Sequence, residues 1–218
     1  KYSGVAFIAD TKQRGQGEAC DRLRNGKARS HPHPDHARQG AGTFTRRRQR
    51  HGGHHRHRDE GALEGAAAYA AAHPDEFCVG IDLITHRVER SVRKQTLGKL
   101  DNVLFLKAEA TEFLDALPAT VALRKIFILY PDPWPKKKHH KNRFINAENL
   151  ARLAAHAAAG ARLHFRTDNA DYFAWTGEHL AAHPGWRVEP AAAWPFEQKT
   201  FFEERMKERR DMFADRRG

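Results

Sequence analysis

The sequence predicts a single α/β domain whose sheet is mainly parallel and covered by helices on both faces. From Leu63 onward, apolar segments of strand length alternate with longer segments of helical periodicity, which is the pattern of such folds. The chain of 218 residues is long enough for one domain of this class with a proper core, and short for two. Repeats of solenoid period are absent from the sequence.

The expected elements begin with a helix and then alternate between strands and helices. Strands are expected at short apolar runs, and helices where apolar residues recur with a helical period. In chain order they are an Ala-rich helix over 63–72, a strand over 77–81 (Phe-Cys-Val-Gly-Ile), a helix over 88–97, a strand over 103–106 (Val-Leu-Phe-Leu), a short helix over 111–117, a strand over 125–130 (Lys-Ile-Phe-Ile-Leu-Tyr), an amphipathic helix over 147–158, a strand over 162–166, a helix over 172–183 and a strand over 186–188.

The first 60 residues differ from the rest in composition. They hold 14 Lys and Arg against six Asp and Glu, so most of the net charge of +11 lies where apolar residues are fewest. Their few large apolar residues follow neither a period of two nor a helical period, and a packed core cannot be built from them. We therefore expect residues 1–60 to be a basic, irregular segment that is disordered or translated out of frame. Residues 61–218 are expected to form the folded domain.

Charge and cysteine content narrow the class of protein. The 38 Lys and Arg exceed the 27 Asp and Glu, and the pI near 9.9 suits a polyanionic partner, although many soluble proteins are also basic. The two cysteines lack metal-ligand spacing, so neither a disulfide framework nor a zinc ribbon is indicated, and a reduced cytoplasm is expected. No apolar run approaches the roughly 18 residues that span a bilayer, so no membrane attachment is expected.

The run from Pro131 to Arg143 is the most informative motif. It reads Pro-Asp-Pro-Trp-Pro-Lys-Lys-Lys-His-His-Lys-Asn-Arg and follows the expected strand over 125–130. Its closely spaced prolines exclude a helix and a central strand, so it is a loop at the carboxyl end of that strand, where open α/β sheets bind ligands. Asp132 is a hydrogen-bond acceptor and Trp134 a flat stacking surface, and Lys and His follow. This combination indicates chemistry on an RNA base, against the alternative of a solvated basic loop with a structural Trp.

This run resembles the signature of the bacterial tRNA (guanine-N7-)-methyltransferase family, whose catalytic loop carries a Pro-Asp-Pro-Trp-Pro-Lys-Lys-x-His-His-Lys motif. The resemblance extends from Leu63 to Arg210. It implies the Rossmann-like sheet of class I methyltransferases, S-adenosyl-L-methionine as the cofactor and tRNA as the partner. It also implies that the methyl group is transferred to N7 of the guanosine at position 46 in the tRNA variable loop.

Three carboxylates are expected on the cofactor side of the site. Asp82 ends an apolar strand, where nucleotide-binding α/β folds place an acceptor for ribose hydroxyls, although helix capping is as common a role there. By the resemblance, Asp82 is a ribose ligand, and Glu109 lies near the adenine at a position where the family usually has Asp. Asp132 is expected to lie beside the cofactor and to be the catalytic residue.

On the substrate side, Thr167 and Asp168 follow the strand over 162–166, and either residue could instead cap the next helix. Thr200 and Glu203 have the spacing of a capping box, and this role is compatible with one in a base pocket. The basic residues after Lys207 are expected only to attract phosphates. By the resemblance, the substrate-binding residues are Lys136, Asp168, Thr200, Phe201, Phe202 and Glu203.

The resemblance also requires a glycine-rich loop of the Glu-x-Gly-x-Gly type upstream of Asp82, and the sequence lacks it. The stretch over 51–61 reads His-Gly-Gly-His-His-Arg-His-Arg-Asp-Glu-Gly instead. Its imidazoles at His54, His55 and His57 could bind zinc, but clustered His in an Arg-rich tract is usually solvated, and no metal is expected. The other interpretation is translation out of frame, which the encoding DNA would test. If the tract is authentic, the cofactor pocket lacks one wall, and activity is weak or absent.

Guanine N7 carries a lone pair in the ring plane, so methyl transfer requires alignment rather than prior deprotonation. Asp132 is expected to accept from the Watson–Crick edge of the base and to stabilise the positive charge that develops on it, while Lys136 fixes the loop or a phosphate. Trp134 either stacks on a base or anchors the loop. The main alternative is an RNA-binding protein of methyltransferase ancestry that no longer binds the cofactor, which titration with S-adenosylmethionine would distinguish. A monomer or homodimer is expected.

Overall fold

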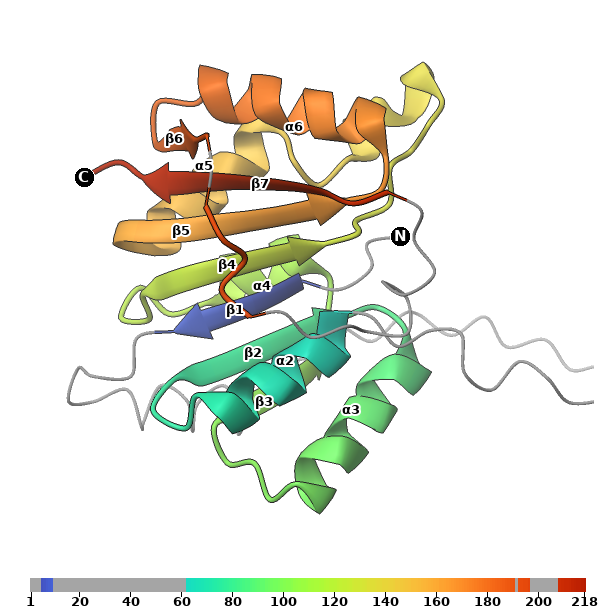
Figure 1. Ribbon diagram of the computed structural model, residues 1–218, viewed down its shortest axis with the longest axis vertical. Coiled ribbons are helices and arrows are strands. Elements are labelled where there is room, and N and C mark those ends of the chain that lie inside the picture. Colours follow the sequence, from blue (N-terminus) through green and yellow to red (C-terminus); the bar gives the residue numbers. More distant parts are fainter. Residues whose placement is uncertain (1–4, 10–61, 191, 197–207) are drawn as a thin grey trace, which may run out of the picture.

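A computed structural model describes residues 5–9, 62–190, 192–196 and 208–218 of the chain. Over these residues the protein forms one seven-stranded sheet in the order β3-β2-β1-β4-β5-β7-β6 (Figure 1). The strands are β1 (Val5–Ala9), β2 (Phe77–Asp82), β3 (Val103–Lys107), β4 (Leu123–Leu129), β5 (Ala157–Thr167), β6 (Trp186–Glu189) and β7 (Arg210–Arg216). The helices are α2 (Ala62–Ala72), α3 (Thr85–Leu97), α4 (Ala110–Ala116), α5 (Ala147–His156) and α6 (Ala170–Ala182), with the 3₁₀ helix η1 (Lys137–Asn142).

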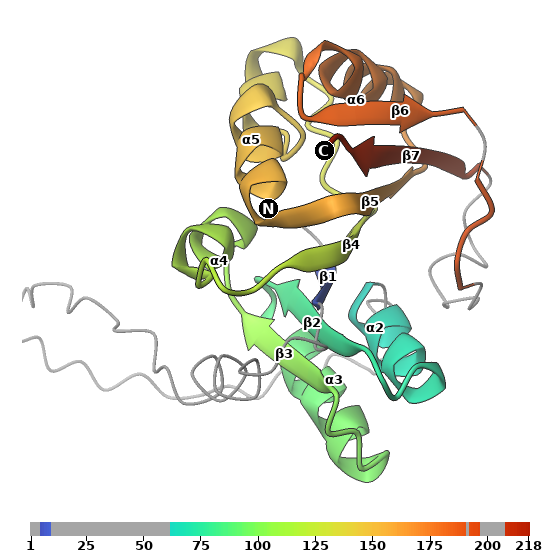
Figure 2. The ribbon, with the colours of Figure 1, turned by 90° about the vertical axis from the view of Figure 1, so that its left-hand side faces the viewer.

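The helices cover both faces of the sheet, which confirms the predicted α/β class. Figure 2 shows α2 and α3 on one face and α4 and α5 on the other. The strands serve both layers because successive side chains point to opposite faces. In β4, Ile126 and Ile128 pack in the core that includes α4, α5 and α6, whereas Phe127 packs in the core beneath α2. Among the helices of the described ranges, none is long and apolar enough to cross a membrane.

The sheet is mixed, which corrects the expectation of a mainly parallel one. β1 lies between β2 and β4 and is antiparallel to both, with Val5 opposite Ile81 and Ile128. The side chain of Phe7 is fully buried and its ring lies 5.2 Å from that of Phe113. A packed strand therefore forms within the segment for which the sequence predicted none. The rest of that segment, including His54, His55 and His57, lies outside the described residues.

β7 is a second strand that the sequence analysis did not predict, since it treated the end of the chain as a basic tail. It pairs antiparallel with β5 and with β6. Arg216 donates from Nε to the carbonyl oxygen of Ala154 (3.0 Å) and from Nη1 to that of Gly185 (3.3 Å). Arg210 donates to the carbonyl oxygen of Asp168 (3.1 Å). These two arginines therefore connect β7 to neighbouring segments through hydrogen bonds. The sequence analysis had expected only phosphate attraction from them.

The helix expected over 147–158 also ends earlier than predicted, because β5 begins at Ala157 and Ala157 pairs with Leu123 of β4. Ala favours helices when it is judged alone. Here the pairing with a buried strand outweighs that preference. The other predicted elements are present, with ends that differ by a few residues.

A half-buried polar network connects α2, β2 and β4 at the edge of the sheet where β2 and β4 begin. Lys125 donates to the Tyr69 hydroxyl (2.7 Å) and to both carboxylate oxygens of Glu76 (2.8 and 3.0 Å), while Tyr69 donates to Glu76 (2.8 Å). Burial and the hydrogen bond to Glu76 raise the pKa of Tyr69. Burial alone would raise the pKa of Glu76, but the hydrogen bonds from Lys125 and Tyr69 lower it. The network leaves the opposite edge of the sheet for the candidate site.

Candidate active site

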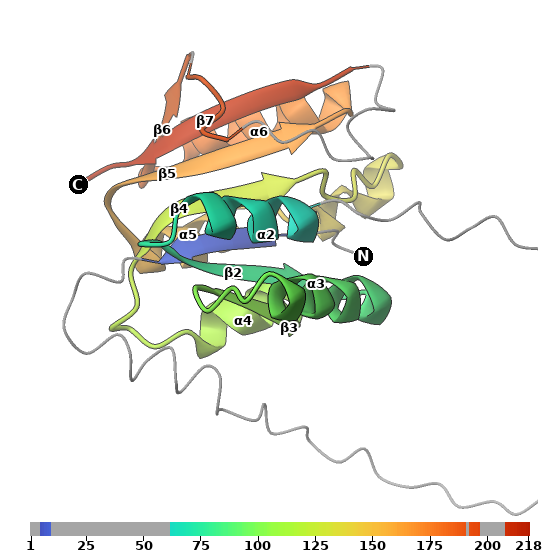
Figure 3. The ribbon, with the colours of Figure 1, turned by 60° about the horizontal axis from the view of Figure 1, so that its bottom comes forward.

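Four of the expected site residues lie just past the carboxyl ends of strands. In strand order they are Glu109 past β3, Asp82 at the end of β2, Asp132 past β4 and Asp168 past β5. β2 is parallel to β3, and β4 to β5, while β1 is antiparallel to both β2 and β4, so these four strands point the same way (Figure 3). The structure therefore brings these residues to one edge of the sheet, which is where open α/β sheets bind ligands.

Asp82 is nearly buried, with 4% of its surface exposed. Its Oδ1 accepts from the backbone N–H of Ile84 (2.8 Å), and its Oδ2 pairs with Nη1 of Arg87 (3.3 Å). Ile84 is the N-cap of α3 and its side chain makes no capping bond, so Asp82 stabilises the turn before the helix. A carboxylate has about four acceptor positions. Asp82 therefore retains acceptor capacity for ribose hydroxyls while it holds this turn.

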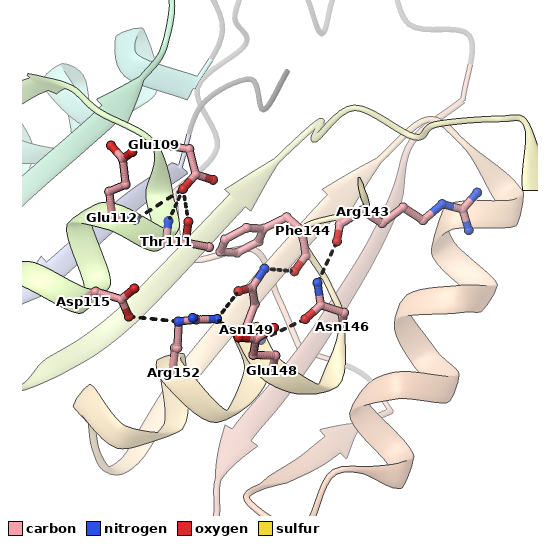
Figure 4. A network of polar contacts seen from close by, with 10 residues as sticks. All are labelled: Glu109, Thr111, Glu112, Asp115, Arg143, Phe144, Asn146, Glu148, Asn149 and Arg152. Carbon is pink, nitrogen blue, oxygen red and sulfur yellow. Dashed lines mark hydrogen bonds and ion pairs between the residues drawn. The ribbon is translucent and has the colours of Figure 1, made fainter. Parts of the chain in front are cut away.

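Glu109 is the N-cap of α4 (Figure 4). Its Oε2 accepts from the backbone N–H groups of Thr111 (3.1 Å) and Glu112 (3.3 Å) and from the hydroxyl of Thr111. The extra methylene relative to Asp lets the carboxylate reach back over the first turn of its own helix. Glu109 thus caps α4. The position near the adenine that the resemblance implies must be compatible with this capping role.

Asp132 lies in a loop whose backbone is unusual at two places. Tyr130 has φ of 48° and Trp134 has φ of 45°, both in the left-handed region, which costs non-glycine residues about 1–2 kcal/mol each. Each precedes a proline, and a following proline disfavours the right-handed helical region. The backbone N–H of Tyr130 donates to the carbonyl oxygen of Arg166 (2.8 Å), which extends the pairing of β4 with β5 into the loop. Strain of this kind gathers at functional sites.

Trp134 is half-buried, and its ring centre lies 5.9 Å from that of His139. Its indole Nε1 is buried, and within the part of the chain that the structure describes it has no hydrogen-bond partner. The ring therefore contributes to the packing of the loop and retains an unused donor. This arrangement is compatible with both the anchoring and the stacking role.

The cationic stretch after the loop divides into exposed and buried residues. Lys136 and the lysines of η1 are exposed, so they can attract phosphate. Arg143 is different, because only 1% of its surface is exposed and its guanidinium is used within the protein. In the sequence, Arg143 is the last cation of the run that begins at Lys136. The apolar residues Phe144 and Ile145 that follow it are the signal that the chain turns inward there.

Arg143 joins the loop to α6. Its Nε donates to the carbonyl oxygen of Pro133 (2.8 Å), and its Nη2 pairs with Asp171 in the first turn of α6. Its guanidinium lies 5.0 Å from the ring centre of Tyr172 and 5.1 Å from that of Trp175. The hydrogen bond from Arg143 lowers the pKa of Asp171, which keeps this carboxylate charged. Figure 4 shows the Arg143 side chain pointing away from α5, while its backbone carbonyl accepts from Asn146.

Asp168 is exposed, directly after β5. Neither Thr167 nor Asp168 caps α6, because Asn169 is the N-cap and its Oδ1 accepts from the backbone N–H of Tyr172 (2.8 Å). The Thr167 hydroxyl accepts from the backbone N–H of Asn169 (3.1 Å). The Asp168 carboxylate is therefore available for the expected contacts with base or ribose groups. Asn169 is the capping residue that the sequence analysis missed, although Asn is among the preferred caps.

Two parts of the expected site cannot be placed. Thr200, Phe201, Phe202 and Glu203 lie outside the described residues, as does the segment directly before α2. The direction of β1 does bear on the cofactor side. Ala9 at its carboxyl end lies opposite Phe77 and Leu123, where β2 and β4 begin. The chain that follows β1 therefore starts at the edge opposite Asp82 and Asp132.

Asp82 and Glu109 fit a nucleoside at this edge, because Asp82 ends β2 and Glu109 follows the adjacent parallel strand β3 by two residues. Among the described ranges, no group of three or more His, Cys, Asp or Glu side chains could hold a metal ion. The arrangement is thus a carboxylate-rich edge beside a strained aromatic loop and a cationic helix. It can bind a nucleoside on one side and attract a polyanion on the other.

These features define an α/β fold with a candidate site at the carboxyl edge of its sheet. The model of a family described as "Putative methyltransferase" matches residues 61–214, which is most of the chain. The chain belongs to this methyltransferase family.

Three relatives carry a more specific name. The tRNA (guanine-N(7)-)-methyltransferase of Caulobacter vibrioides (strain NA1000 / CB15N) is 37% identical over 133 residues, which cover 61% of this chain and 58% of the relative. Proteins of the same name from Thiobacillus denitrificans and Agrobacterium fabrum are 38% and 34% identical, over 51% and 62% of this chain and 49% and 62% of their own lengths. The chain thus spans about half to three-fifths of these relatives.

Solved structures of other methyltransferases are similar at lower identity. The 16S rRNA (adenine(1408)-N(1))-methyltransferase from Catenulisporales acidiphilia is 21% identical with a TM-score of 0.49, over 71% of this chain and 81% of that one. A precorrin-6y C5,15-methyltransferase from Geobacter metallireducens is 17% identical with a TM-score of 0.46, over 70% of this chain and 77% of that one.

Proposed function

We propose that this protein transfers a methyl group from S-adenosyl-L-methionine to N7 of a guanosine in tRNA, at position 46 of the variable loop. Membership of the methyltransferase family and the shared name of the relatives support the reaction. The observation that carries the proposal is the Asp132 loop, which connects β4 to the cationic helix η1 and begins at the same edge of the sheet as Asp82 and Glu109. The proposal includes tRNA as the partner and the cytoplasm as the location.

In this proposal Asp82 accepts from the ribose hydroxyls of the cofactor, and Glu109 lies on the adenine side. S-Adenosylmethionine, when bound, supplies an electrophilic methyl group on a sulfonium. Asp82 has the acceptor capacity for this role, because the protein's own donors occupy only part of its carboxylate. Because β1 runs the other way, its carboxyl end contributes no backbone N–H groups at this edge. We therefore expect the cofactor to bind weakly.

Asp132 is the proposed catalytic residue. Guanine N7 needs no deprotonation before it is methylated, so the protein acts mainly by orienting the base. The Asp132 carboxylate accepts from the N–H groups of the Watson–Crick edge and stabilises the positive charge that develops on the ring. The strained backbone at Tyr130 and Trp134 presents this carboxylate past the end of β4.

The remaining substrate contacts follow from exposure and charge. Lys136 is exposed beside the loop and binds phosphate, and the lysines of η1 add to the attraction of the RNA backbone. Asp168, with its carboxylate not used for capping, accepts from base or ribose groups. Thr200, Phe201, Phe202 and Glu203 complete the base pocket in this proposal.

The variant Asp132→Asn tests the role of the carboxylate. It keeps the shape of the side chain and removes the charge, so methyl transfer to tRNA is expected to fall by about 100-fold or more. Asp115→Asn is the matched control, because Asp115 pairs with Arg152 between α4 and α5, away from the loop (Figure 4). Transfer of radiolabelled methyl groups to tRNA measures both variants. Full activity of Asp132→Asn beside an active wild-type protein would refute the proposed role.

A further inference from the structure

The loop that carries Asp132 has a strained backbone and makes a hydrogen bond with the side chain of Arg143. Left-handed residues persist only where the surroundings determine them, and the loop contains two, Tyr130 and Trp134. On one side, the loop is tied to β5 through the backbone N–H of Tyr130. On the other side, the carbonyl of Pro133, which lies next to Asp132, accepts from Nε of Arg143.

The other end of Arg143 is anchored in a rigid element. Its Nη2 pairs with Asp171 in the first turn of α6, and its guanidinium packs near the rings of Tyr172 and Trp175. These ring residues are themselves fixed, because the Tyr172 hydroxyl accepts from the backbone N–H of Ile145 (3.1 Å) and the Trp175 indole donates to the carbonyl oxygen of Ile145 (2.7 Å). The loop is thus connected through one side chain to a helix on the sheet.

Lysine cannot reproduce these contacts. Arg143 donates in two directions from a planar group and presents a flat face to aromatic rings, whereas an ammonium is a single point of charge. A Lys at this position could reach either the Pro133 carbonyl or Asp171. The guanidinium is 1% exposed, so it is not positioned to bind phosphate of an incoming nucleic acid.

We propose that Arg143 is a positioning residue that fixes the presentation of Asp132 by joining the Pro133 carbonyl to the first turn of α6. The kinetic test of this inference rests on the proposed function. The structural test rests on the geometry alone. Arg143 touches neither base nor cofactor in this account and acts through Asp132.

The test compares the variant Arg143→Lys with the control Arg152→Lys in the full chain. Arg152 makes exposed ion pairs with Asp115 and Glu148 and does not contact the loop. For Arg143→Lys, kcat for methyl transfer to tRNA is expected to fall about 10- to 100-fold, because misplacement of a reacting group has effects of this size. The KM values for tRNA and S-adenosylmethionine are expected to change by less than about threefold. Arg152→Lys should match the wild type.

A double variant separates positioning from general damage to the fold. If Arg143 acts through Asp132, adding Arg143→Lys to Asp132→Asn should lower kcat by less than about threefold more, because groups that act as a unit are not additive. A merely structural role would lower kcat by the same factor in both backgrounds. That multiplicative result would overturn the proposal.

A measurement without activity distinguishes failure of this inference from failure of the proposed function. The exposed lysines next to the loop are trypsin sites, and their cleavage should be about tenfold faster in Arg143→Lys under native conditions. An unchanged cleavage rate would overturn the proposal whether or not the wild type methylates tRNA. If Arg143→Lys does not fold, Asp171→Asn loosens the same contact from α6 and should also accelerate cleavage, and an unchanged rate there would again refute the inference.

Discussion

Asp132 is flanked by two residues with left-handed backbone, and the groups that stabilise this conformation lie outside the loop. The backbone of β5 and the side chain of Arg143 each make one hydrogen bond to it. Either bond contributes about 1 kcal/mol, more where a charge takes part, which is comparable to the cost of a left-handed residue. These two hydrogen bonds therefore contribute measurably to the conformation of the loop. Single substitutions at those contacts should be detectable.

His164 provides a prediction about pH at the same scale. It is 3% exposed, and its ring stacks 4.5 Å from Phe127 with Trp194 and Phe213 around it. Burial, reinforced by the positive charges of Arg162 and Lys125, lowers the pKa of His164 to about 4. Because the unfolded chain binds a proton near pH 6.5 and the folded one does not, stability is lost as pH falls from about 6.5 to about 4.

The expected loss over this range is about 3 kcal/mol of unfolding free energy. His164→Phe keeps a ring in the aromatic cluster and removes the titration, so its stability should depend less on pH over the same range. Urea unfolding at several pH values measures both proteins. Parallel curves for the two would show that His164 does not titrate as argued.

Some residue roles follow from sequence and others require neighbours in space. Asp82, Asp132 and Asp168 could be placed at one sheet edge because each follows an apolar strand. The burial of Arg143 could not be predicted from the sequence, because it depends on contacts with Asp171 and Trp175, which are distant in the sequence. The cap of α6 was missed for a different reason. Three successive polar residues precede that helix, and only the backbone geometry selects Asn169.

At the scale of elements, α2 is positioned by its close approach to β2. A Cβ added to Gly80 would lie 2.8 Å from an atom of the Phe105 ring and 2.9 Å from one of the Leu63 side chain. Leu63 is in the first turn of α2, so the missing side chain lets this end of the helix lie close to the sheet. The helix in turn begins at the same edge as the candidate site, because it runs antiparallel to β2.

Gly80→Ala is expected to destabilise the protein by about 1–3 kcal/mol, the usual cost of overpacking a core. Gly65→Ala is the matched control, because Gly65 lies within α2 and a Cβ there meets nothing within 4 Å. Replacing a glycine inside a helix by alanine should stabilise by about 0.5–1 kcal/mol. Thermal or urea unfolding of both variants gives the comparison. Destabilisation by Gly65→Ala as large as by Gly80→Ala would contradict the packing argument.

The α-helices and strands from α2 to β6 could be predicted because each has its own apolar period. The 3₁₀ helix η1 was not predicted, because the prolines before it indicated a loop throughout the run to Arg143. β7 could not be predicted, because charged residues obscure its alternation of apolar and polar side chains. The partners of these charges lie on β5. Arg166 pairs with Asp211 (2.7 Å) and Arg162 with Asp215 (2.6 Å), so these charges are paired across strands in the sheet. β1 was missed because its neighbours in sequence are basic and irregular. The elements that bury Phe7 of β1, among them β2, β4 and α4, lie far along the chain.

At the scale of the whole molecule, the reversed β1 is the feature that most affects function. Parallel strands joined by a helix form right-handed crossovers, and β1, α2 and β2 do not form such a unit because β1 is antiparallel to β2. The absence of a glycine-rich motif from the sequence agrees with this topology. Translation out of frame within residues 1–60 stays the proposed explanation for the missing motif, and the cofactor side of the site would then be incomplete.

The proposed substrate side does not depend on β1. The part of the chain after α3 carries Asp132 with its loop, η1 and Asp168. The contacts of these groups do not involve β1. Binding of tRNA and turnover are therefore expected to be affected differently. Recognition of tRNA should be preserved, while turnover should be limited by weak binding of the cofactor.

The central claim is the identity of the methylated atom. The most direct test is to incubate the full chain with S-adenosylmethionine, at a concentration high enough to offset weak binding, and with tRNA that lacks N7-methylguanosine. Nuclease digestion and mass spectrometry then locate the modified nucleoside. The account predicts N7-methylguanosine at position 46 and at no other guanosine. A methyl group on another atom or at another nucleotide, or no methylation despite measured binding of both tRNA and S-adenosylmethionine, would contradict it.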